Sequence, residues 1–429
     1  MLKRSVRRLL LVIIVVVGCT APPGREAFVL RIAAWGPLGE LAPTGGNESS
    51  LASIAQPWVF ERLFSLDATG QLKPGLAARV ERLSGQRVRV ELRRGATFSD
   101  GSSVTEDDVV RSLQAGGFQV IQSGGGLIVA PLDSGLPVDA LLLEARIFRQ
   151  SNGKFVGSGP FAVVTQTDTE LRLSRRTPQA GRVNDVRVIA YPTPRDAFAH
   201  TLKGDANLIP DLESRWLEFF RGVPSLQVVH GTGRTTDTIA FNVTLPRSER
   251  IQLARILESQ RVRESAYASG ECAESSGTSD GGDGILAAGP VLRVLSWGPF
   301  ERLALAVRRA LGDRGGEVSH LSPQNALALM KSHDFDLVAV RPLRWPPSAM
   351  PLVWRTGAPH NFVGYSNPAV DQALDAGDWP SAESALREDP PAAFVCTRDH
   401  LAVVDVRIKN PVLGPYELLE TLPDWEIAQ

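Results

Sequence analysis

The sequence predicts an α/β protein that contains a doubly wound parallel sheet. The main observation is an ordered run of strand and helix patterns between residues 291 and 340. A second observation is the strict alternation of apolar and polar residues over 87–93, which indicates a half-buried strand. The third is size, because 429 residues with 43% hydrophobic content are enough for roughly two to three domains.

The composition argues against several classes of protein. A net charge of −1 with this apolar content excludes intrinsic disorder as the main state of the chain. It also argues against a sequence-independent nucleic-acid binder, since counterion release requires an excess of Lys and Arg. Three cysteines are too few for a scaffold built on disulfides.

The N-terminus has the pattern of a lipoprotein signal. Cations at positions 3, 4, 7 and 8 precede an apolar run over 9–17, which is far shorter than the roughly 20 residues of a membrane-spanning helix. The run ends at Gly18-Cys19, which resembles the lipobox of bacterial lipoproteins. This resemblance implies a signal peptide over 1–18, lipidation of Cys19 and a short tether over 19–26. A plain signal peptide, or a short anchor with a chance cysteine, is the alternative.

Cleavage after Gly18 would change the charge of the chain and its redox setting. It removes four of the 46 Lys and Arg residues, so the remaining 42 face 47 Asp and Glu residues. The mature protein would be mildly acidic and would face an oxidising compartment. Cys272 and Cys396 could pair there, but the sequence does not give their separation in space, so a disulfide and two free thiols both stay open.

Before residue 291 the expected elements are a mixture of strands and helices. A strand over 28–35 is followed by a helix pattern over 53–64 that Pro57 interrupts. Thr105 is expected to cap a helix whose first turn is acidic, which suits the helix dipole. Further expected elements are a hairpin over 161–174, strands over 183–191 and 239–243, and a solvated polar loop over 271–284.

The run from 291 to 340 has the pattern of two βα units followed by a third strand. Its order is a strand over 291–297, a helix over 299–315, a strand over 317–321, a helix over 323–331 and a strand over 335–340. Ligands of such sheets bind beyond the carboxyl ends of the strands. The third strand ends at a loop with Arg341, Arg344 and Trp345, so this loop is a candidate ligand contact.

Five segments carry a resemblance to a known family. They are, in chain order, Phe60 to Ala77, Leu92 to Val109, Gly157 to Phe161, Phe241-Asn242 and Asn361 to Asp371. These segments resemble motifs of the peptide/nickel-type extracellular solute-binding proteins, the substrate-capturing subunits of ABC importers. The most specific segment reads LRRGATFSDG and then VTEDDV, beginning at Leu92.

The resemblance implies a two-lobed periplasmic-binding-protein fold of the α/β class, type II-like and of class C. Two lobes would be joined by a hinge and would enclose the ligand when they close, with an extra β-rich subdomain in the first lobe. The implied division is a first lobe of 27–65 and 180–242 rejoined by 405–429, a subdomain of 66–179, and a second lobe of 243–404.

The chain departs from the family pattern in the loop after the third strand. Peptide-binding members commonly place an aspartate there to hold the α-amino group of the peptide. This chain has Arg341 and Arg344 instead and no acidic residue in the loop, and a cation repels an ammonium group. An Arg fork suits a carboxylate or a phosphate, so we expect an anionic ligand or an atypical role. The alternative is that both arginines face solvent or pair with Asp or Glu.

The expected ligand contacts come from both lobes. They are Arg341, Arg344, Trp345 and Asn361 from the second lobe, with Trp35 and Glu40 facing them from the first. Aromatic side chains dominate ligand burial, but each tryptophan could instead pack in a core.

No enzymatic chemistry, cofactor or metal site is expected. Ser151 and Lys154 match an S-x-x-K motif, but the Asn-Gly pair between them favours a turn over the helix that this motif needs. The six histidines are scattered without metal-ligand spacing. His360 is the one beside a family motif, and some relatives bind metal chelates.

These observations together predict a lipid-anchored, extracytoplasmic, monomeric solute-binding protein. It would deliver a peptide or an anionic solute to ABC permease subunits by hinge closure and would not bind nucleic acid. The alternative is a degenerate relative that acts as a scaffold or sensor in the cell envelope rather than in transport.

Overall fold

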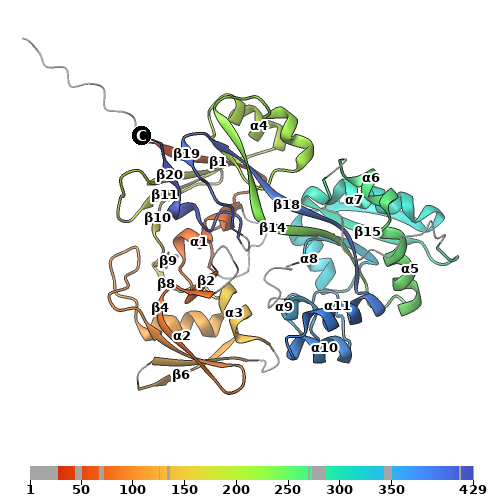
Figure 1. Cartoon of the computed structure of the whole chain (residues 1–429), viewed down its shortest axis with the longest axis horizontal. Helices are drawn as coiled ribbons and strands as arrows, with labels where there is room; N and C mark the ends of the chain where they lie inside the picture. The colour runs from red at the N-terminus through yellow and green to blue at the C-terminus, as the bar shows by residue number, and fades with distance from the viewer. Residues whose placement is uncertain are drawn as a thin grey trace, which may run out of the picture.

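The computed structural model consists of two lobes joined by two long strands, with a subdomain attached to the first lobe (Figure 1). The structure describes residues 28–43, 51–66, 72–124, 126–132, 136–268, 271–272, 286–342, 350–414 and 417–428. The expected signal peptide, the tether and Cys19 lie outside these residues. Within the described part of the chain, no helix is both long and apolar enough to cross a membrane.

The first lobe is built on a mixed sheet around β1. Its elements are β1 (Val29–Trp35), η1 (Leu51–Ala55), α1 (Gln56–Val59), β10 (Phe161–Gln166), β11 (Glu170–Arg175), β12 (Asp185–Tyr191), α4 (Pro194–Leu202), β13 (Leu208–Ile209), η2 (Ser214–Phe219), β19 (Ile408–Lys409) and β20 (Glu426–Ile427). β1 pairs in parallel with both β12 and β13. Leu30 and Ile32 of β1 are fully buried, as expected for a strand in the middle of a covered sheet.

The subdomain is a four-stranded antiparallel sheet covered by helices. Its elements are β2 (Phe64–Leu66), β3 (Leu72–Pro74), β4 (Ala77–Leu83), β5 (Arg87–Leu92), α2 (Glu106–Ala115), β6 (Phe118–Ser123), β7 (Gly126–Pro131), α3 (Val138–Glu144), β8 (Phe148–Ser151) and β9 (Lys154–Gly157). In β5 the alternation seen in the sequence buries Val88 and Val90 and leaves the charged residues outside. The predicted cap of α2 is confirmed, because Thr105 and Asp108 form a reciprocal capping box.

The predicted hairpin over 161–174 forms, but it belongs to a different unit. β11 pairs with β12 of the first lobe, so β10 and β11 extend the first-lobe sheet. Phe161, Leu171 and Leu173 are buried in the first-lobe core. The subdomain therefore ends near Gly157, and its expected end at residue 179 is wrong.

The second lobe contains the predicted βαβαβ unit. Its elements are α5 (Arg247–Leu257), α6 (Gln260–Ala266), β15 (Leu292–Trp297), η3 (Gly298–Phe300), α7 (Glu301–Ala310), β16 (Gly315–Leu321), α8 (Pro323–Lys331), β17 (Leu337–Val340), α9 (Met350–Trp354), α10 (Pro368–Asp375) and α11 (Trp379–Glu388). β15 lies between β16 and β17 and is parallel to both, which confirms the expected parallel sheet.

Two crossover strands, β14 (Leu226–Phe241) and β18 (Ala392–Asp405), run antiparallel through both lobes (Figure 1). They give one continuous strand order, β10-β11-β12-β1-β13-β18-β14-β17-β15-β16. The short strand expected over 239–243 is the end of β14, which is 16 residues long. One sheet therefore supports both lobes.

The helix expected over 53–64 is wrong beyond Val59. The chain forms the 3-10 turn η1 and the four-residue helix α1, and Phe60 is extended. The later apolar residues leave the helix because Leu63 and Phe64 are buried in the subdomain core. Tertiary burial thus overrides the helical spacing at this point.

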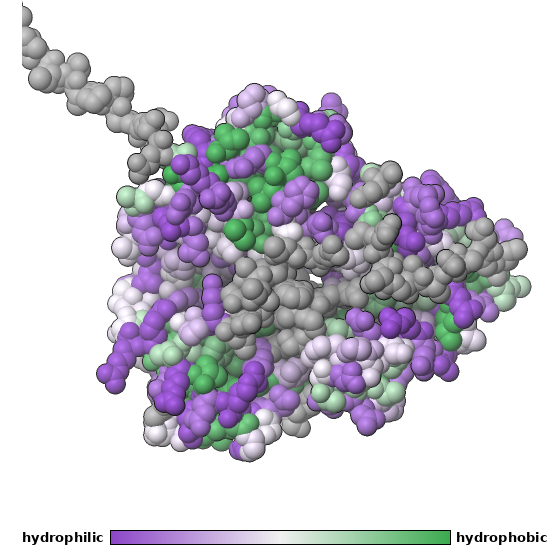
Figure 2. All heavy atoms as spheres, viewed as in Figure 1, coloured by the Kyte–Doolittle hydropathy of each residue, from purple (hydrophilic) through white to green (hydrophobic). Residues whose placement is uncertain are grey.

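Apolar side chains also reach the surface of the first lobe. Figure 2 shows an apolar area over the part of this lobe that holds α4 and the start of β14. Leu202, Phe219 and Val228 are each more than a third exposed there.

Candidate functional site

The crossover strands are irregular where they pass between the lobes. In β14, residues 226–230 pair with β18 inside the first lobe, and residues 238–240 pair with it inside the second. The register shifts after His230 and again after Asp237. Such irregularities bend and twist a strand, so this stretch is the candidate for the hinge that the sequence analysis expects, and it is called the hinge below.

A cluster of charged side chains surrounds the hinge. Its members, called the hinge cluster below, are Asp211, Asp237, Arg341, Arg398 and His400. Asp237 lies on β14, and Arg398 and His400 lie on β18. Asp211 follows β13 of the first lobe, and Arg341 follows β17 of the second. The cluster therefore links both lobes to both crossover strands.

Arg341 makes the shortest contacts of this cluster. Its Nε donates to Oδ1 of Asp237 at 2.7 Å, and its Nη1 donates to Oδ2 of Asp211 at 3.1 Å. Arg398 lies 3.8 Å from Asp237 and 3.9 Å from Asp211. Tyr267 adds a hydrogen bond from its hydroxyl to Oδ2 of Asp237 at 3.1 Å. Each aspartate is thus shared between two arginines.

The surroundings shift the pKa of two groups in opposite directions. Burial alone would raise the pKa of the Asp211 carboxyl, but His400, whose Nδ1 lies 3.7 Å from Oδ1, and the charges of Arg341 and Arg398 hold this pKa well below its usual range. Burial raises the pKa of the Tyr267 hydroxyl well above its ordinary value, and the adjacent carboxylate raises it further. Asp211 therefore stays ionised at neutral pH, and Tyr267 stays protonated.

A recess between the lobes opens beside the hinge cluster. It is lined by Glu213 and Arg215 of the first lobe and by Tyr267, Phe300 and Arg302 of the second, and it offers the centre of a water molecule only about 10 Å³ of space. Asp237, Arg341 and Arg398 form part of its wall. Nη1 of Arg398 is buried there without a hydrogen-bond partner. The wall is mixed in charge, which suits polar or zwitterionic groups better than apolar ones.

Solved structures with the same architecture are found for nearly the whole chain. NikA from Staphylococcus aureus, in complex with Ni(L-His)2, aligns with a TM-score of 0.73 and 14% identity over 93% of this chain and 99% of its own. The oligopeptide-binding protein AppA from Bacillus subtilis, in complex with a nonapeptide, aligns with a TM-score of 0.74 and 15% identity over 94% and 99%. The murein tripeptide binding protein MppA from Escherichia coli aligns with a TM-score of 0.73 and 16% identity over the same shares.

The chain has the peptide/nickel solute-binding fold. The resemblance seen in the sequence is thereby confirmed at the level of the fold. No protein-family model matches the sequence, and no curated protein matches it either. At 14–16% identity the structural likeness carries the architecture alone.

Within this fold, Arg341 does not offer the free cation that the sequence predicted. Arg341 uses two of its five N–H donors on Asp237 and Asp211, so the pairing with Asp that was left open for this residue is found, and its role as a ligand contact remains a prediction. Arg344 and Trp345 lie outside the described residues, so their roles as ligand contacts remain predictions.

The other predicted contacts are dispersed. Trp35 is half-buried and packs edge-to-face on Phe198 of α4, with ring centroids 5.8 Å apart. Glu40 is exposed in the loop after β1. The Asn361 side-chain amide donates to the carbonyls of Arg355 and Tyr365, and its oxygen accepts from the Tyr365 N–H. Asn361 thus braces its own loop, and its role as a ligand contact remains a prediction.

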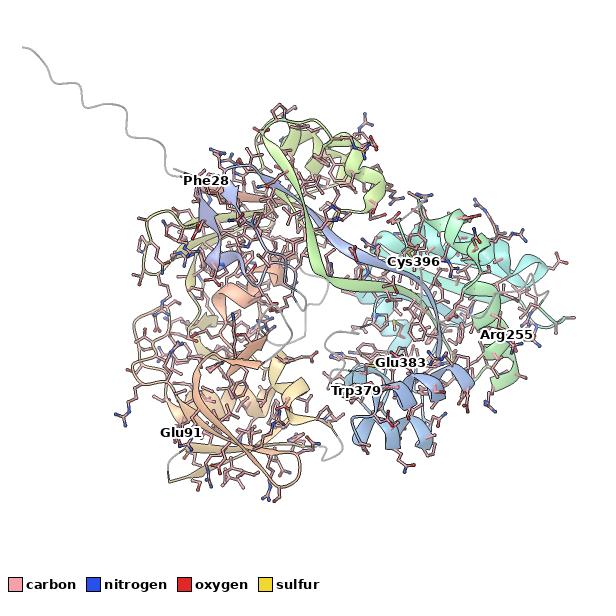
Figure 3. The ribbon with its side chains drawn as sticks, viewed as in Figure 1. Phe28, Glu91, Arg255, Trp379, Glu383 and Cys396 are labelled. Atoms are coloured by element: carbon pink, nitrogen blue, oxygen red, sulfur yellow. A yellow bond between two sulfur atoms is a disulfide. The ribbon has the colours of Figure 1, made fainter. Side chains whose placement is uncertain are left out.

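The two cysteines left open by the sequence are bonded to each other. The Cα atoms of Cys272 and Cys396 are 5.1 Å apart, and the sulfurs form a disulfide. Cys396 lies on β18 where this strand passes into the second lobe (Figure 3). The bridge ties the segment after α6 to the hinge. Within the described residues, no group of His, Cys, Asp and Glu side chains could hold a metal ion.

A second contact between the lobes was not predicted. Nε2 of His360 lies 2.9 and 3.1 Å from the two carboxylate oxygens of Glu144 in the subdomain. The residues are 216 positions apart, so no local pattern could pair them. The only signal in the sequence was the position of His360 beside the motif that begins at Asn361.

Proposed function

We propose that this chain is the substrate-binding lipoprotein of an ABC importer. It captures a peptide or a similar small solute between its two lobes and delivers it to the permease. The observation that carries the proposal is the pair of crossover strands, β14 and β18, whose ladder is irregular between the lobes. An irregular two-strand connection lets rigid lobes rotate about a small region, as hinge closure requires.

Binding rather than catalysis fits the chemistry of the hinge region. The charged groups there are arranged as ion pairs, with Arg341 between Asp211 and Asp237. Covalent catalysis typically uses a nucleophile next to a base that is oriented by a third group, and the paired charges of the hinge cluster do not have that arrangement. The proposed action is therefore a population shift between open and closed lobes, set by the difference in solute affinity.

The site of action in this proposal is outside the cytoplasmic membrane. The N-terminal pattern supports lipidation of Cys19, and the disulfide between Cys272 and Cys396 is typical of an oxidising compartment. A single anchored monomer that meets the permease by diffusion in the membrane plane completes the proposal.

The class of solute follows only in part from the structure. Since Arg341 is paired with two aspartates, the proposed preference for an anion rests on other cations, among them Arg344, next to Trp345 in the sequence, and the recess residues Arg302 and Arg398. The mixed charges of the interlobe recess suit a polar or zwitterionic group, but the recess holds little more than a water molecule in this structure, so a short peptide would require the lobes to move apart.

The experiment is identification of the bound solute. The protein is purified gently from membranes, denatured, and its released small molecules are identified by mass spectrometry. Peptides, anions and metal chelates are then screened by thermal shift. A solute at 100 times its Kd should add about 2.7 kcal/mol to the free energy of unfolding. A screen in which no solute co-purifies and none raises the melting temperature would contradict a transport role.

One observation favours a scaffold or sensor role as the second candidate. Leu352 and Ala358 of the second lobe are buried in the core of the subdomain, and this contact must break before the lobes can open. A chain that stays closed could still bind an envelope partner. Genes for a permease and an ATPase beside this gene would support transport, and their absence would favour the second candidate.

A further inference from the structure

In the described part of the chain, residues 350–361 of the second lobe contact the subdomain. This segment consists of α9 and the loop that follows it. Leu352 has no exposed surface and Ala358 is 7% exposed, and both belong to the apolar cluster of the subdomain, together with Leu141 and Leu142 of α3. The second lobe thus inserts two of its side chains into the core of another unit.

The same segment is firmly attached to its own lobe. Val353 and Trp354, the residues next to Leu352, are buried in the core of the second lobe. Trp354 packs edge-to-face on Phe394 of β18, with ring centroids 5.9 Å apart. Nε of Arg355 donates to Asp375 of α10 at 2.9 Å. Adjacent residues of α9 therefore point into two different units.

The loop after α9 is held in shape for this contact. The Asn361 amide bridges the carbonyls of Arg355 and Tyr365, at 3.0 and 2.7 Å. The N–H of His360 donates to the carbonyl of Leu352 at 2.9 Å. This bond couples the apolar contact of Leu352 to the polar contact between His360 and Glu144 of α3.

We propose that residues 350–361 form a latch that holds the subdomain and the second lobe together and so sets how readily the cleft opens. Rotation about the hinge in β14 and β18 must withdraw Leu352 and Ala358 from the subdomain core and break the bond between His360 and Glu144. Exposure of the two apolar side chains to water opposes that movement. The latch consists of contacts within the protein, so its effect on cleft opening does not depend on which solute binds.

Hydrogen exchange of the full chain, with no solute added, tests the latch. Two amides report on its two sides: the Ala145 N–H at the end of α3, which donates to Leu141, and the His360 N–H, which donates to Leu352. Leu352→Ala should speed exchange in the peptides that contain either amide by roughly tenfold or more, because the contact is lost from both units.

Val353→Ala is the matched control, since the neighbouring side chain packs only in the second lobe. It should speed exchange around His360 and leave the peptide with Ala145 unchanged. If Leu352→Ala also leaves the Ala145 peptide unchanged, the latch is overturned and Leu352 is an ordinary core residue.

A second pair of variants avoids the core altogether. His360→Ala and Glu144→Ala change half-exposed side chains, so both proteins should fold. If the polar contact is part of the latch, each single variant should speed exchange in both peptides, and the double variant should add little more. If the double variant speeds exchange by the full sum of the two single effects, the contact between His360 and Glu144 is not part of the latch. Neither result depends on whether a solute is found, so a failure of the latch is distinct from a failure of the transport proposal.

Discussion

Nε of Arg341 donates to Oδ1 of Asp237 at 2.7 Å and joins the end of a second-lobe strand to a crossover strand. In α/β sheets the carboxyl end of a strand usually offers its groups to a ligand. Here the side chain at that position is used inside the protein, because the Asp237 side chain is 6% exposed and needs a charge partner. The hinge is therefore held by ion pairs rather than by apolar packing alone.

Replacing Arg341 by methionine should destabilise the protein strongly. The change leaves Asp237 with the more distant Arg398, at 3.8 Å, as its remaining cation. Removing one partner of a buried ion pair typically costs about 3 kcal/mol or more. We expect a loss of this size in the free energy of unfolding, measured by urea denaturation at neutral pH.

Arg221→Met is the control for this change. Arg221 pairs with Glu218 at 2.8 Å, but both side chains are about 70% exposed. Exposed pairs of this kind contribute about 0.2–1 kcal/mol. Equal losses for the two variants would mean that the hinge cluster does not hold the lobes.

Acid should weaken the fold below about pH 4. The pKa of Asp211 is held well below its usual range, because nearby His400 and two arginines outweigh the effect of burial. The pKa of Glu417 is also lowered, since Arg146 and Arg62 outweigh its burial. A carboxyl whose pKa is lowered by folding stabilises the protein fully above its unfolded pKa, and this contribution is lost as the pH falls through the folded pKa.

Stability measured by denaturation between about pH 6 and pH 2 checks this prediction. Asp211→Asn should lower stability at neutral pH and make the loss on acidification shallower, because one of the linked carboxyls is gone. Asp313→Asn, which removes an exposed carboxylate, should leave the slope unchanged. An identical acid response in both variants and the wild type would refute the role of Asp211.

Local sequence patterns predicted the elements whose stabilising contacts lie within a few residues. The cap of α2 by Thr105 was foreseen for this reason, and the run from β15 to β17 was foreseen from its repeated strand and helix patterns, although its strands pair over longer distances in the chain. Arg341 was placed at the correct strand end, but its partners are 104 and 130 residues away. Sequence patterns cannot identify partners at that distance, so the sequence could not show that Arg341 pairs with Asp211 and Asp237.

The same limit explains the misplaced hairpin and the disulfide. The pattern of β10 and β11 identifies a hairpin, but the pairing of β11 with β12 decides which sheet it joins. Cys272 and Cys396 are 124 residues apart, and only the fold brings their Cα atoms to 5.1 Å. The placement of the hairpin and the pairing of the cysteines both depend on contacts between distant parts of the chain, which the sequence does not reveal.

Removing the disulfide should destabilise the second lobe and the hinge together. The bridge closes a segment of 124 residues, and a crosslink over a long segment typically adds about 2–4 kcal/mol by restricting the unfolded chain. We expect the double variant Cys272→Ser with Cys396→Ser to lose stability in this range. Wild-type protein unfolded with and without a reducing agent should differ by a similar amount.

Thiol titration of the unfolded, unreduced protein is the control for that experiment. Cys272 and Cys396 should not react, which leaves Cys19 as the one remaining cysteine of the chain. Reaction of two or more thiols would show that the bridge is absent, and any stability loss in the double variant would then have another cause.

Gly159→Ala should be costly because the backbone of α1 passes directly over this residue. A Cβ at position 159 would lie far inside van der Waals contact with the carbonyl oxygen of Trp58, and backbone cannot move aside as a flexible side chain can. Trp58 is itself fully buried, and its indole N–H donates to the carbonyl of Leu419 at 2.6 Å. Overpacking of this kind costs about 1–3 kcal/mol, and we expect the upper end, measured as the shift of the urea midpoint.

Gly124→Ala is the matched control, because a Cβ there meets nothing within 4 Å, and it should change stability by less than about 0.5 kcal/mol. If the two alanine variants unfold at the same urea concentration, the close approach of α1 to the 157–161 segment is not a feature of the folded protein.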